Sequence, residues 1–250
     1  MKAIILAAGE GSRMGKLAQN IPKPLVMVNG KSIIERQLSI LKQNKILDVI
    51  IVTGSHNEKF NFKNVVYVND LEHKKHDTLG SLITARDYMN DEIIITYADQ
   101  IFDEKIIESI NNFSGDIGIA VDLDWEKNYV NRDQHPKSEA ENILINGNEV
   151  LEIRKNILAC KENEKIGECL GLMKFSRKAS KVFLDKYSEL EISHQGKFHN
   201  ASSLEKALIS DMIQELIDSE INVEPIYVSG KWCEIDTSQD LEIARKMFEE

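Results

Sequence analysis

The feature that most constrains this chain is a short apolar run near its start that ends in small residues. Ala3-Ile4-Ile5-Leu6 has the length of one buried strand, and Ala7-Ala8-Gly9-Glu10-Gly11 follows it directly. Small residues let a backbone pass close to a ligand, and glycine adopts backbone angles that other residues avoid. Successive N–H groups in such a turn bind anions, and a following helix N-terminus strengthens the effect. The pattern predicts either a simple strand-to-helix turn or a phosphate-binding loop that consists of Leu6, Ala7, Ala8, Gly9, Gly11 and Ser12.

Two well-known phosphate loops do not match this turn. A Walker A loop requires glycine at the position of Glu10 and Ser or Thr at that of Leu17, and the dinucleotide fingerprint requires glycine at that of Met14. Two cationic residues nevertheless favour an anionic ligand. Arg13 has a permanent charge and forked donors that suit phosphate oxygens. Lys23 lies between two prolines, which stiffen the backbone around it.

Continuous apolar stretches alternate with amphipathic ones along the chain. The expected strands cover residues 2–6, 48–54, 65–68, 92–99, 117–121 and 224–228, and the expected helices 32–42, 78–88, 174–190, 203–219 and 237–248. Continuously apolar strands are typical of parallel sheets that helices cover on both faces. The chain is therefore predicted to be one α/β domain, residues 1–250, with a Rossmann-like, mixed but mostly parallel sheet flanked by helices. Ligands bind such sheets beyond the carboxyl ends of the strands.

Two neighbouring motifs resemble the signature of the nucleotidyltransferases: Leu6-Ala7-Ala8-Gly9-x-Gly11-Ser12-Arg13-Met14 and Pro22-Lys23-Pro24-Leu25. These enzymes join a nucleoside triphosphate to a phosphorylated small molecule and release pyrophosphate, and their fold is that of the nucleotide-diphospho-sugar transferases. The resemblance implies that the glycine turn holds the triphosphate. It also implies that Arg13 and Lys23 are catalytic residues, which neutralise the charge that builds up during transfer.

Two acidic positions are candidates for binding a metal. Asp99 ends an apolar strand, where a carboxylate is well placed for Mg²⁺, which prefers oxygen ligands and bridges phosphates. Asp236 lies in a segment that resembles the second acidic segment of the family. The resemblance implies that Asp99 and Asp236 bind Mg²⁺ together, with Glu234 as a helper. The alternative role of each aspartate is to cap the helix that follows it, for which Asp103 and Thr237 are further candidates.

Residues 77–82, Asp-Thr-Leu-Gly-Ser-Leu, occupy the place where relatives recognise the base. Gly80 would let the base approach the backbone, and Ser81 would either donate to a base carbonyl or start the helix. Asp77 would either cap this helix or accept a hydrogen bond from an exocyclic amine, which cytosine has and uracil lacks. The segment resembles that of the phosphocholine and phosphonate cytidylyltransferases more than the Gln-Pro version of many sugar-phosphate enzymes. CTP is therefore the expected nucleotide.

Residues from about 122 to 171 are more irregular and polar, and we expect them to form an acceptor-binding section. Its candidate residues are Asp122, Asp124, Trp125, Tyr129 and Arg132. The arginine suits a phosphate or phosphonate, and the aromatic side chains suit a small organic group or a cation. The alternative is a loop pinned by its aromatics, with the arginine paired to one of the two aspartates. Relatives hold the acceptor's phosphate with a lysine near the position of Lys155, for which a solvated basic pair with Arg154 is the alternative.

The expected reaction is CMP transfer from CTP to a small phosphonate or phosphate monoester, with release of pyrophosphate. Aminoethylphosphonate, hydroxyethylphosphonate, phosphocholine and phosphorylated amides are the candidate acceptors. An aminoalkyl acceptor is favoured because Asp122 and Asp124 lie beside the aromatic residues. A sugar-1-phosphate nucleotidyltransferase and a non-catalytic nucleotide-binding regulator are the alternatives.

Composition narrows the range of partners. The net charge of −10 argues against a nucleic acid or a membrane surface as the main partner. Cys160, Cys169 and Cys233 lack metal-binding spacing and are expected to be reduced thiols of a cytoplasmic protein. The sequence has no stretch typical of a secretory signal or a membrane span. The family resemblance also suggests a homodimer.

Overall fold

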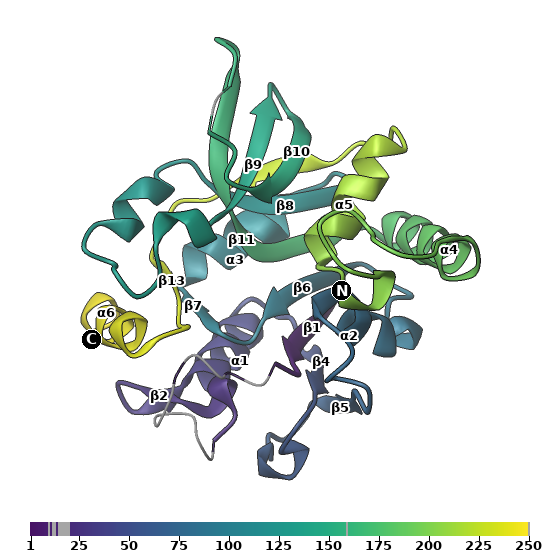
Figure 1. The fold of residues 1–250 in the computed structure, drawn as a ribbon. Helices are drawn as coiled ribbons and strands as arrows, with labels where there is room; N and C mark the ends of the chain where they lie inside the picture. Colours follow the sequence, from purple (N-terminus) through teal and green to yellow (C-terminus); the bar gives the residue numbers. More distant parts are fainter. Residues whose placement is uncertain (10, 12–13, 15–20, 159, 250) are drawn as a thin grey trace.

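The computed structural model describes residues 1–9, 11, 14, 21–158 and 160–249. A nine-stranded sheet has the strand order β10-β9-β11-β6-β1-β4-β5, with β8 beside β11 and β12 beside β8 (Figure 1). Its strands are β1 (Lys2–Ala7), β4 (Asp48–Thr53), β5 (Val66–Asn69), β6 (Ile93–Tyr97), β8 (Ile117–Asp122), β9 (Glu141–Asn146), β10 (Glu149–Lys155), β11 (Glu164–Phe175) and β12 (Glu224–Tyr227). The α-helices are α1 (Ile33–Gln43), α2 (Thr78–Thr84), α3 (Glu104–Asn112), α4 (Arg177–Ser193), α5 (Ile209–Asp218) and α6 (Ser238–Met247).

The part of the sheet that carries the glycine turn is parallel. β1 pairs in parallel with both β4 and β6, so that Leu6 lies beside Val52 and Tyr97. β5 continues the parallel arrangement beyond β4. β11 runs antiparallel to β6 and also pairs with β9 of the antiparallel hairpin β9–β10. This mixed sheet flanked by helices confirms the predicted fold class.

Two apolar layers cover the sheet because successive side chains of a strand point to opposite faces. Ile4 packs in one layer with Leu79 of α2 and Phe183 of α4. Its neighbour Ile5 packs in the other layer with Leu41 of α1 and with residues of α3. Complete burial of each isoleucine contributes roughly 1.5–3 kcal/mol to stability. The layers hold β1 rigidly, and with it the start of the glycine turn.

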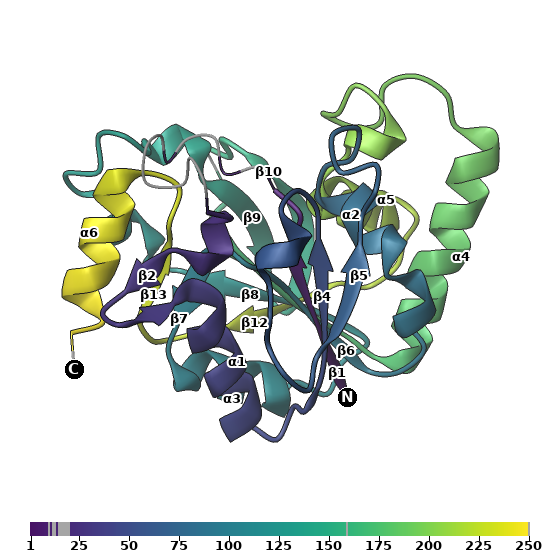
Figure 2. The same cartoon turned by 90° about the horizontal axis from the view of Figure 1, so that it is seen from below.

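A smaller apolar cluster joins α6 to α1. Two short antiparallel pairs lie there: β2 (Met27–Val28) with β3 (Lys31–Ser32), and β7 (Gln100–Phe102) with β13 (Trp232–Glu234). β3 and β7 contact α1, whereas β2 and β13 contact α6. Figure 2 places α6 and α4 at opposite sides of the molecule. The pairing of β7 with β13 brings the C-terminal part of the chain back to the end of β6.

Several element boundaries differ from those expected. Residues 122–171 are less irregular than predicted, because they contain the hairpin β9–β10 and much of β11. The strands of this hairpin mix polar with apolar residues, so they give a weak signal in the sequence. The expected helix 203–219 begins only at Ile209, and the expected helix 78–88 ends at Thr84. Among the described residues, no helix has both the length and the apolar character needed to cross a membrane.

Candidate active site

A large cavity formed by the described residues opens at the carboxyl ends of β1 and β6. Its volume is about 1050 Å³. Eleven residues that the sequence predicted for the site line it: Leu6, Ala7, Ala8, Gly9, Gly11, Lys23, Asp77, Ser81, Asp99, Lys155 and Asp236. They come from the glycine turn, from the helix after β5, and from the ends of β6, β10 and β13. The cavity thus lies where ligands bind in such sheets.

The pairing of β7 with β13 places the two predicted metal-binding aspartates close together. Gln100 lies opposite Glu234 in this pair. Ile235 donates its backbone N–H to the backbone oxygen of Asp99 over 2.8 Å. Asp99 immediately precedes β7, and Asp236 follows β13 after one residue. Both carboxylates therefore reach the same wall of the cavity.

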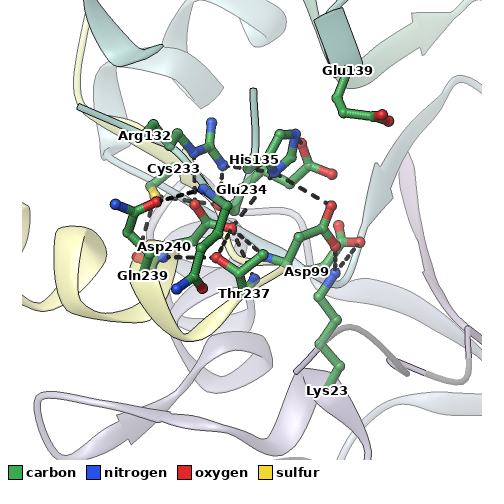
Figure 3. Close-up of polar contacts among 12 residues, drawn as sticks. Lys23, Asp99, Arg132, His135, Glu139, Cys233, Glu234, Thr237, Gln239 and Asp240 are labelled. Carbon is green, nitrogen blue, oxygen red and sulfur yellow. Dashed lines mark hydrogen bonds and ion pairs between the residues drawn. The ribbon is translucent and has the colours of Figure 1, made fainter. Parts of the chain in front are cut away.

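Lys23 lies between these two carboxylates (Figure 3). Its Nζ is 3.0 Å from Oδ2 of Asp99 and forms an ion pair with Oδ1 of Asp236. Burial lowers the pKa of Lys23, but the charges of Asp99 and Asp236 outweigh burial and raise this pKa above its ordinary value. The ammonium group is therefore charged at neutral pH and is fixed on the cavity wall.

Other residues cap the helices that follow the two aspartates. α3 has Asp103 at its N-cap position, and α6 has Thr237, whose hydroxyl accepts from the backbone N–H of Asp240. The Asp240 carboxylate in turn accepts from the backbone N–H groups of Asp236 and Thr237, over 3.1 and 2.8 Å. The side chains of Asp99 and Asp236 line the cavity instead.

The side chains gathered here suit a divalent cation. Asp99, Glu234 and Asp236 offer carboxylate oxygens, which are the ligands that Mg²⁺ prefers. Oδ1 of Asp99 is buried and has no hydrogen-bond partner among the described residues. Ligand atoms of His135, Glu234 and Asp236 also lie within 4.8 Å of one another. Sequence reasoning missed His135, because a single histidine in a polar loop gives no signal without the fold.

The glycine turn approaches Lys23 closely. Gly11 has a φ of +63°, in the left-handed region that favours glycine. A Cβ at this position would lie only 3.0 Å from Cβ of Lys23. Both the backbone and the packing therefore require glycine. Ser12 and Arg13 lie outside the described residues, so their predicted roles at the triphosphate stay predictions.

The predicted base-recognition residues make local contacts at another wall of the cavity. Asp77 is the N-cap of α2 and accepts from the backbone N–H of Thr78 over 2.8 Å, but it also lines the cavity. Ser81 lines the cavity as well. Gly80 does not: it packs against His76, whose ring a Cβ at Gly80 would approach to 2.6 Å. The small size of Gly80 accommodates a histidine ring, and its predicted role at the base stays a prediction.

Asp70, which directly follows β5, organises this wall. Its carboxylate is buried and accepts from the Ser81 hydroxyl over 2.9 Å. It also shares a hydrogen bond of 2.9 Å with Nδ1 of His76. His73 and Lys74, from the same turn, line the cavity with His76. The basic run at residues 73–76 was the available signal for this wall.

Arg132 supports the site from behind and does not line the cavity. Its buried guanidinium donates from Nε to Asp240 over 2.6 Å and from a terminal nitrogen to the backbone oxygen of Glu234 over 3.0 Å. A buried charge requires such a partner. Arg132 thus pairs with Asp240 and not with Asp122 or Asp124, and its predicted role in acceptor binding stays a prediction.

The two aromatic residues of the same segment pin its loop. Trp125 and Tyr129 pack edge to face with ring centres 5.7 Å apart, and the Tyr129 hydroxyl donates to Glu168. Asp124 is exposed and pairs with Lys127. None of these residues lines the cavity. The alternative of a loop pinned by its aromatics fits this part of the structure.

Asp122 also serves the scaffold: its carboxylate accepts from the indole N–H of Trp232 over 2.9 Å and does not line the cavity. Lys155, by contrast, does line it, and its Nζ is 2.8 Å from Glu139. A smaller recess of about 140 Å³ adjoins the cavity near Lys155. Sequence reasoning missed its further walls, which include Gln100, His135, Glu139, Glu141 and Glu168.

A large polar cavity beyond parallel strands, with a lysine between two aspartates, is typical of enzymes that handle nucleoside phosphates. The sequence matches the MobA-like NTP transferase domain over residues 3–126. The CTP:phosphoglutamine cytidylyltransferase of Campylobacter jejuni is 30% identical over 256 residues, which cover 97% of this chain and 98% of that protein. The chain belongs to the nucleotidyltransferase family and, within it, to the cytidylyltransferases.

Two further comparisons support this placement. A choline-phosphate cytidylyltransferase of Streptococcus pneumoniae is 50% identical over 62 residues, which cover 25% of this chain and 27% of that protein. The solved structure of a CTP:phosphocholine cytidylyltransferase from Streptococcus pneumoniae matches with a TM-score of 0.76 and 23% identity, over 99% of both chains. The structural likeness confirms the fold over the whole chain.

Proposed function

We propose that this protein transfers CMP from CTP to a small phosphorylated acceptor and releases pyrophosphate. Phosphoglutamine, or a related phosphorylated amide, is the first candidate acceptor. The observation that carries the proposal is the 30% identity, over almost the whole of both chains, to the phosphoglutamine enzyme. The cavity is consistent with it, because Asp99 and Asp236 line both the large hollow and the smaller recess, and Lys23 pairs with both carboxylates.

The proposed reaction is a direct displacement at the α-phosphorus of CTP. An anionic oxygen of the acceptor's phosphate forms the new P–O bond. The bond from the α-phosphorus to the oxygen bridging the β-phosphate breaks, and its electron pair leaves with pyrophosphate. No proton has to be removed from the attacking oxygen. Catalysis therefore depends on alignment and on stabilisation of charge.

Each wall of the cavity has a role in this proposal. The backbone of the glycine turn and the Lys23 ammonium bind the triphosphate, with Arg13 as a further cation. Asp77 and Ser81 face the base, and Lys155 takes the acceptor's phosphate. Mg²⁺ held by Asp99 and Asp236 would neutralise charge on the phosphates. We also expect a cytoplasmic homodimer, with neither a nucleic acid nor a membrane as partner.

The acceptor is the least constrained part of the proposal. Asp122 and Asp124 do not line the cavity, so they no longer favour an aminoalkyl acceptor. Trp125 and Tyr129 likewise no longer argue against a sugar. Aminoethylphosphonate, hydroxyethylphosphonate and phosphocholine remain candidates beside phosphoglutamine, and sugar 1-phosphates are the alternative class.

Pyrophosphate release tests the proposal directly. CTP, UTP, ATP, GTP and dTTP are each combined with Mg²⁺ and with one acceptor from the set of phosphoglutamine, phosphocholine, the two phosphonates and several sugar 1-phosphates. We expect turnover with CTP and a non-sugar acceptor. Turnover restricted to a sugar 1-phosphate would contradict the proposed acceptor class, and turnover restricted to another nucleotide would contradict the proposed base.

A further inference from the structure

The recess beside the Asp99–Asp236 pair has an acidic wall that the proposed transfer step does not use. The recess and the cavity share Tyr97, Lys155 and Leu208, so the two hollows are continuous. Beyond this mouth, Glu139, Glu141 and Glu168 line the recess. Lys155 stands at the mouth and already pairs with Glu139 over 2.8 Å. The far wall is therefore rich in carboxyl groups.

Two buried oxygens on this wall have no hydrogen-bond partner among the described residues. They are Oε2 of Glu168 and Oε1 of Gln100, on residues that are 3% and 2% exposed. A buried polar atom without a partner costs about 1–3 kcal/mol, and a charged one costs more. Oε1 of Gln100 is an acceptor, and so is Oε2 of Glu168 in the ionised form of this carboxyl group, so the missing partner is a hydrogen-bond donor.

We infer that the recess binds a primary ammonium group of the acceptor, so that the substrate class is a small phosphorylated compound that carries –NH₃⁺. This inference rests on the proposed function and identifies the end of the acceptor that is remote from its phosphate. An ammonium group supplies three N–H donors for Glu168 and Gln100, together with the positive charge that the acidic wall lacks. Lys155 at the mouth then remains for the phosphate.

Other small groups match this wall less well. A trimethylammonium group has the charge but no N–H donor, and proteins usually bind it through aromatic faces. A hydroxyl group offers one donor and no charge. Either group would leave at least one of the two oxygens, on Glu168 or Gln100, without a partner. The recess therefore distinguishes a primary ammonium group from a trimethylammonium or hydroxyl group by hydrogen bonding and charge together.

Tyr129 acts as a positioning residue for this contact. Its hydroxyl donates to Oε1 of Glu168, which leaves Oε2 as the oxygen without a partner. Burial raises the pKa of Glu168 to about 8, against the opposing effects of Tyr129 and Arg132. A cation placed beside Glu168 would favour the ionised form. Tyr129, which the sequence predicted for acceptor binding, thus acts on the proposed acceptor indirectly, by positioning Glu168.

A series of acceptors with the unaltered enzyme gives the first test. The series contains phosphoethanolamine, its N-methyl and N,N-dimethyl derivatives, phosphocholine and ethyl phosphate, together with phosphoglutamine and its N-acetyl derivative. We expect kcat/KM to fall with each methyl group, and by about 10- to 100-fold in all, because a hydrogen bond to a charged group is lost. N-acetylation of phosphoglutamine should have an effect of similar size.

Turnover that does not depend on the ammonium group would overturn the inference and leave the proposed function intact. No pyrophosphate release from CTP with any of these acceptors, or with either phosphonate, would contradict both.

The variant Glu168→Gln gives the second test, because it keeps the size of the side chain and removes its charge. We expect the KM for the ammonium-bearing acceptor to rise by about 10- to 100-fold, with kcat and the KM for CTP unchanged. The KM for ethyl phosphate should stay the same. Tyr129→Phe should act in the same direction but less strongly. Glu149→Gln, at an exposed end of β10, is the matched control. Equal losses for acceptors with and without the ammonium group would assign Glu168 a purely structural role.

Discussion

Lys23 is the side chain on which the proposed chemistry depends most. Its ammonium lies between Asp99 and Asp236 and is fixed by both. We expect Lys23→Ala to lower kcat by at least about 100- to 1000-fold, because a preorganised charge at the triphosphate is lost. Steady-state pyrophosphate release measures the effect, and circular dichroism checks that the variant folds. Lys31→Ala, at an exposed lysine of β3, is the control. Normal turnover of Lys23→Ala would contradict the assignment of this residue.

Mg²⁺ should stabilise the folded protein through Asp99 and Asp236 even in the absence of substrate. A cation that binds the folded state but not the unfolded chain raises the melting temperature, and the rise grows with the ratio of its concentration to its Kd. We therefore expect Mg²⁺ to raise the Tm of the wild type, and to raise that of Asp99→Asn or Asp236→Asn much less. Differential scanning fluorimetry with and without Mg²⁺ measures both. An equal rise in all three proteins would place the cation elsewhere.

Glu168 should make stability depend on pH. Burial raises its pKa from 4.5 to about 8 in the folded state. A carboxyl group whose pKa is raised by folding stabilises the folded state at pH values below its pKa in the unfolded chain. This contribution is lost as the pH rises through its pKa in the folded state. The Glu168→Gln variant has no titrating carboxyl group at this position, so its stability lacks this dependence on pH. The Tm of the variant, relative to the wild type, should therefore increase by on the order of 10 °C between roughly pH 5 and pH 9. A difference in Tm that is constant across this range would contradict the assigned pKa.

At the scale of elements, the buried pair of Arg132 and Asp240 connects the loop at 123–140 to the start of α6. Arg132→Met leaves the Asp240 carboxylate buried without its cation, which typically costs about 3–5 kcal/mol. Lys127→Met breaks the exposed pair with Asp124, which is worth only about 0–1 kcal/mol. Urea unfolding of both variants measures the contrast. Similar losses of unfolding free energy in the two variants would show that the buried pair contributes no more to stability than the exposed pair does.

The elements that build the site were only partly predictable. The strand before Asp99 and the capped helix after Asp236 follow from local patterns. The pairing of β7 with β13, which brings these aspartates together, joins three-residue segments from distant parts of the chain. Segments so short have no periodicity to detect. Their proximity was inferred from the family resemblance, and its physical cause appears only in the fold.

The same limit explains the errors around the acceptor. Arg132 and the aromatic residues have the composition of a binding site, but the sequence does not tell which side of a loop faces the cavity. Glu168 lies on β11 and Gln100 on β7, among apolar residues. Nothing in the spacing of these two residues marks them as parts of a site. A buried polar atom without a partner is visible only when all of its neighbours are known.

At the scale of the whole molecule, the chain combines a parallel part that carries the glycine turn with an antiparallel part that carries the acceptor recess. The first part was predictable because β1, β4 and β6 are continuously apolar, and because β1 and β6 lead directly into motif residues. The second was not, because the hairpin β9–β10 is half polar. The Asp99 and Asp236 carboxylates lie between the two parts, where the proposed nucleotide and acceptor would meet.

The ³¹P NMR spectrum of a mixture of the protein, CTP, Mg²⁺ and phosphoglutamine tests the central claim most directly. The account predicts that the α-phosphorus signal of CTP is replaced by signals of a new phosphoric anhydride, together with one equivalent of pyrophosphate, and that UTP reacts far more slowly. Full turnover of CTP with a sugar 1-phosphate, and none with phosphoglutamine, phosphocholine or either phosphonate, would contradict it.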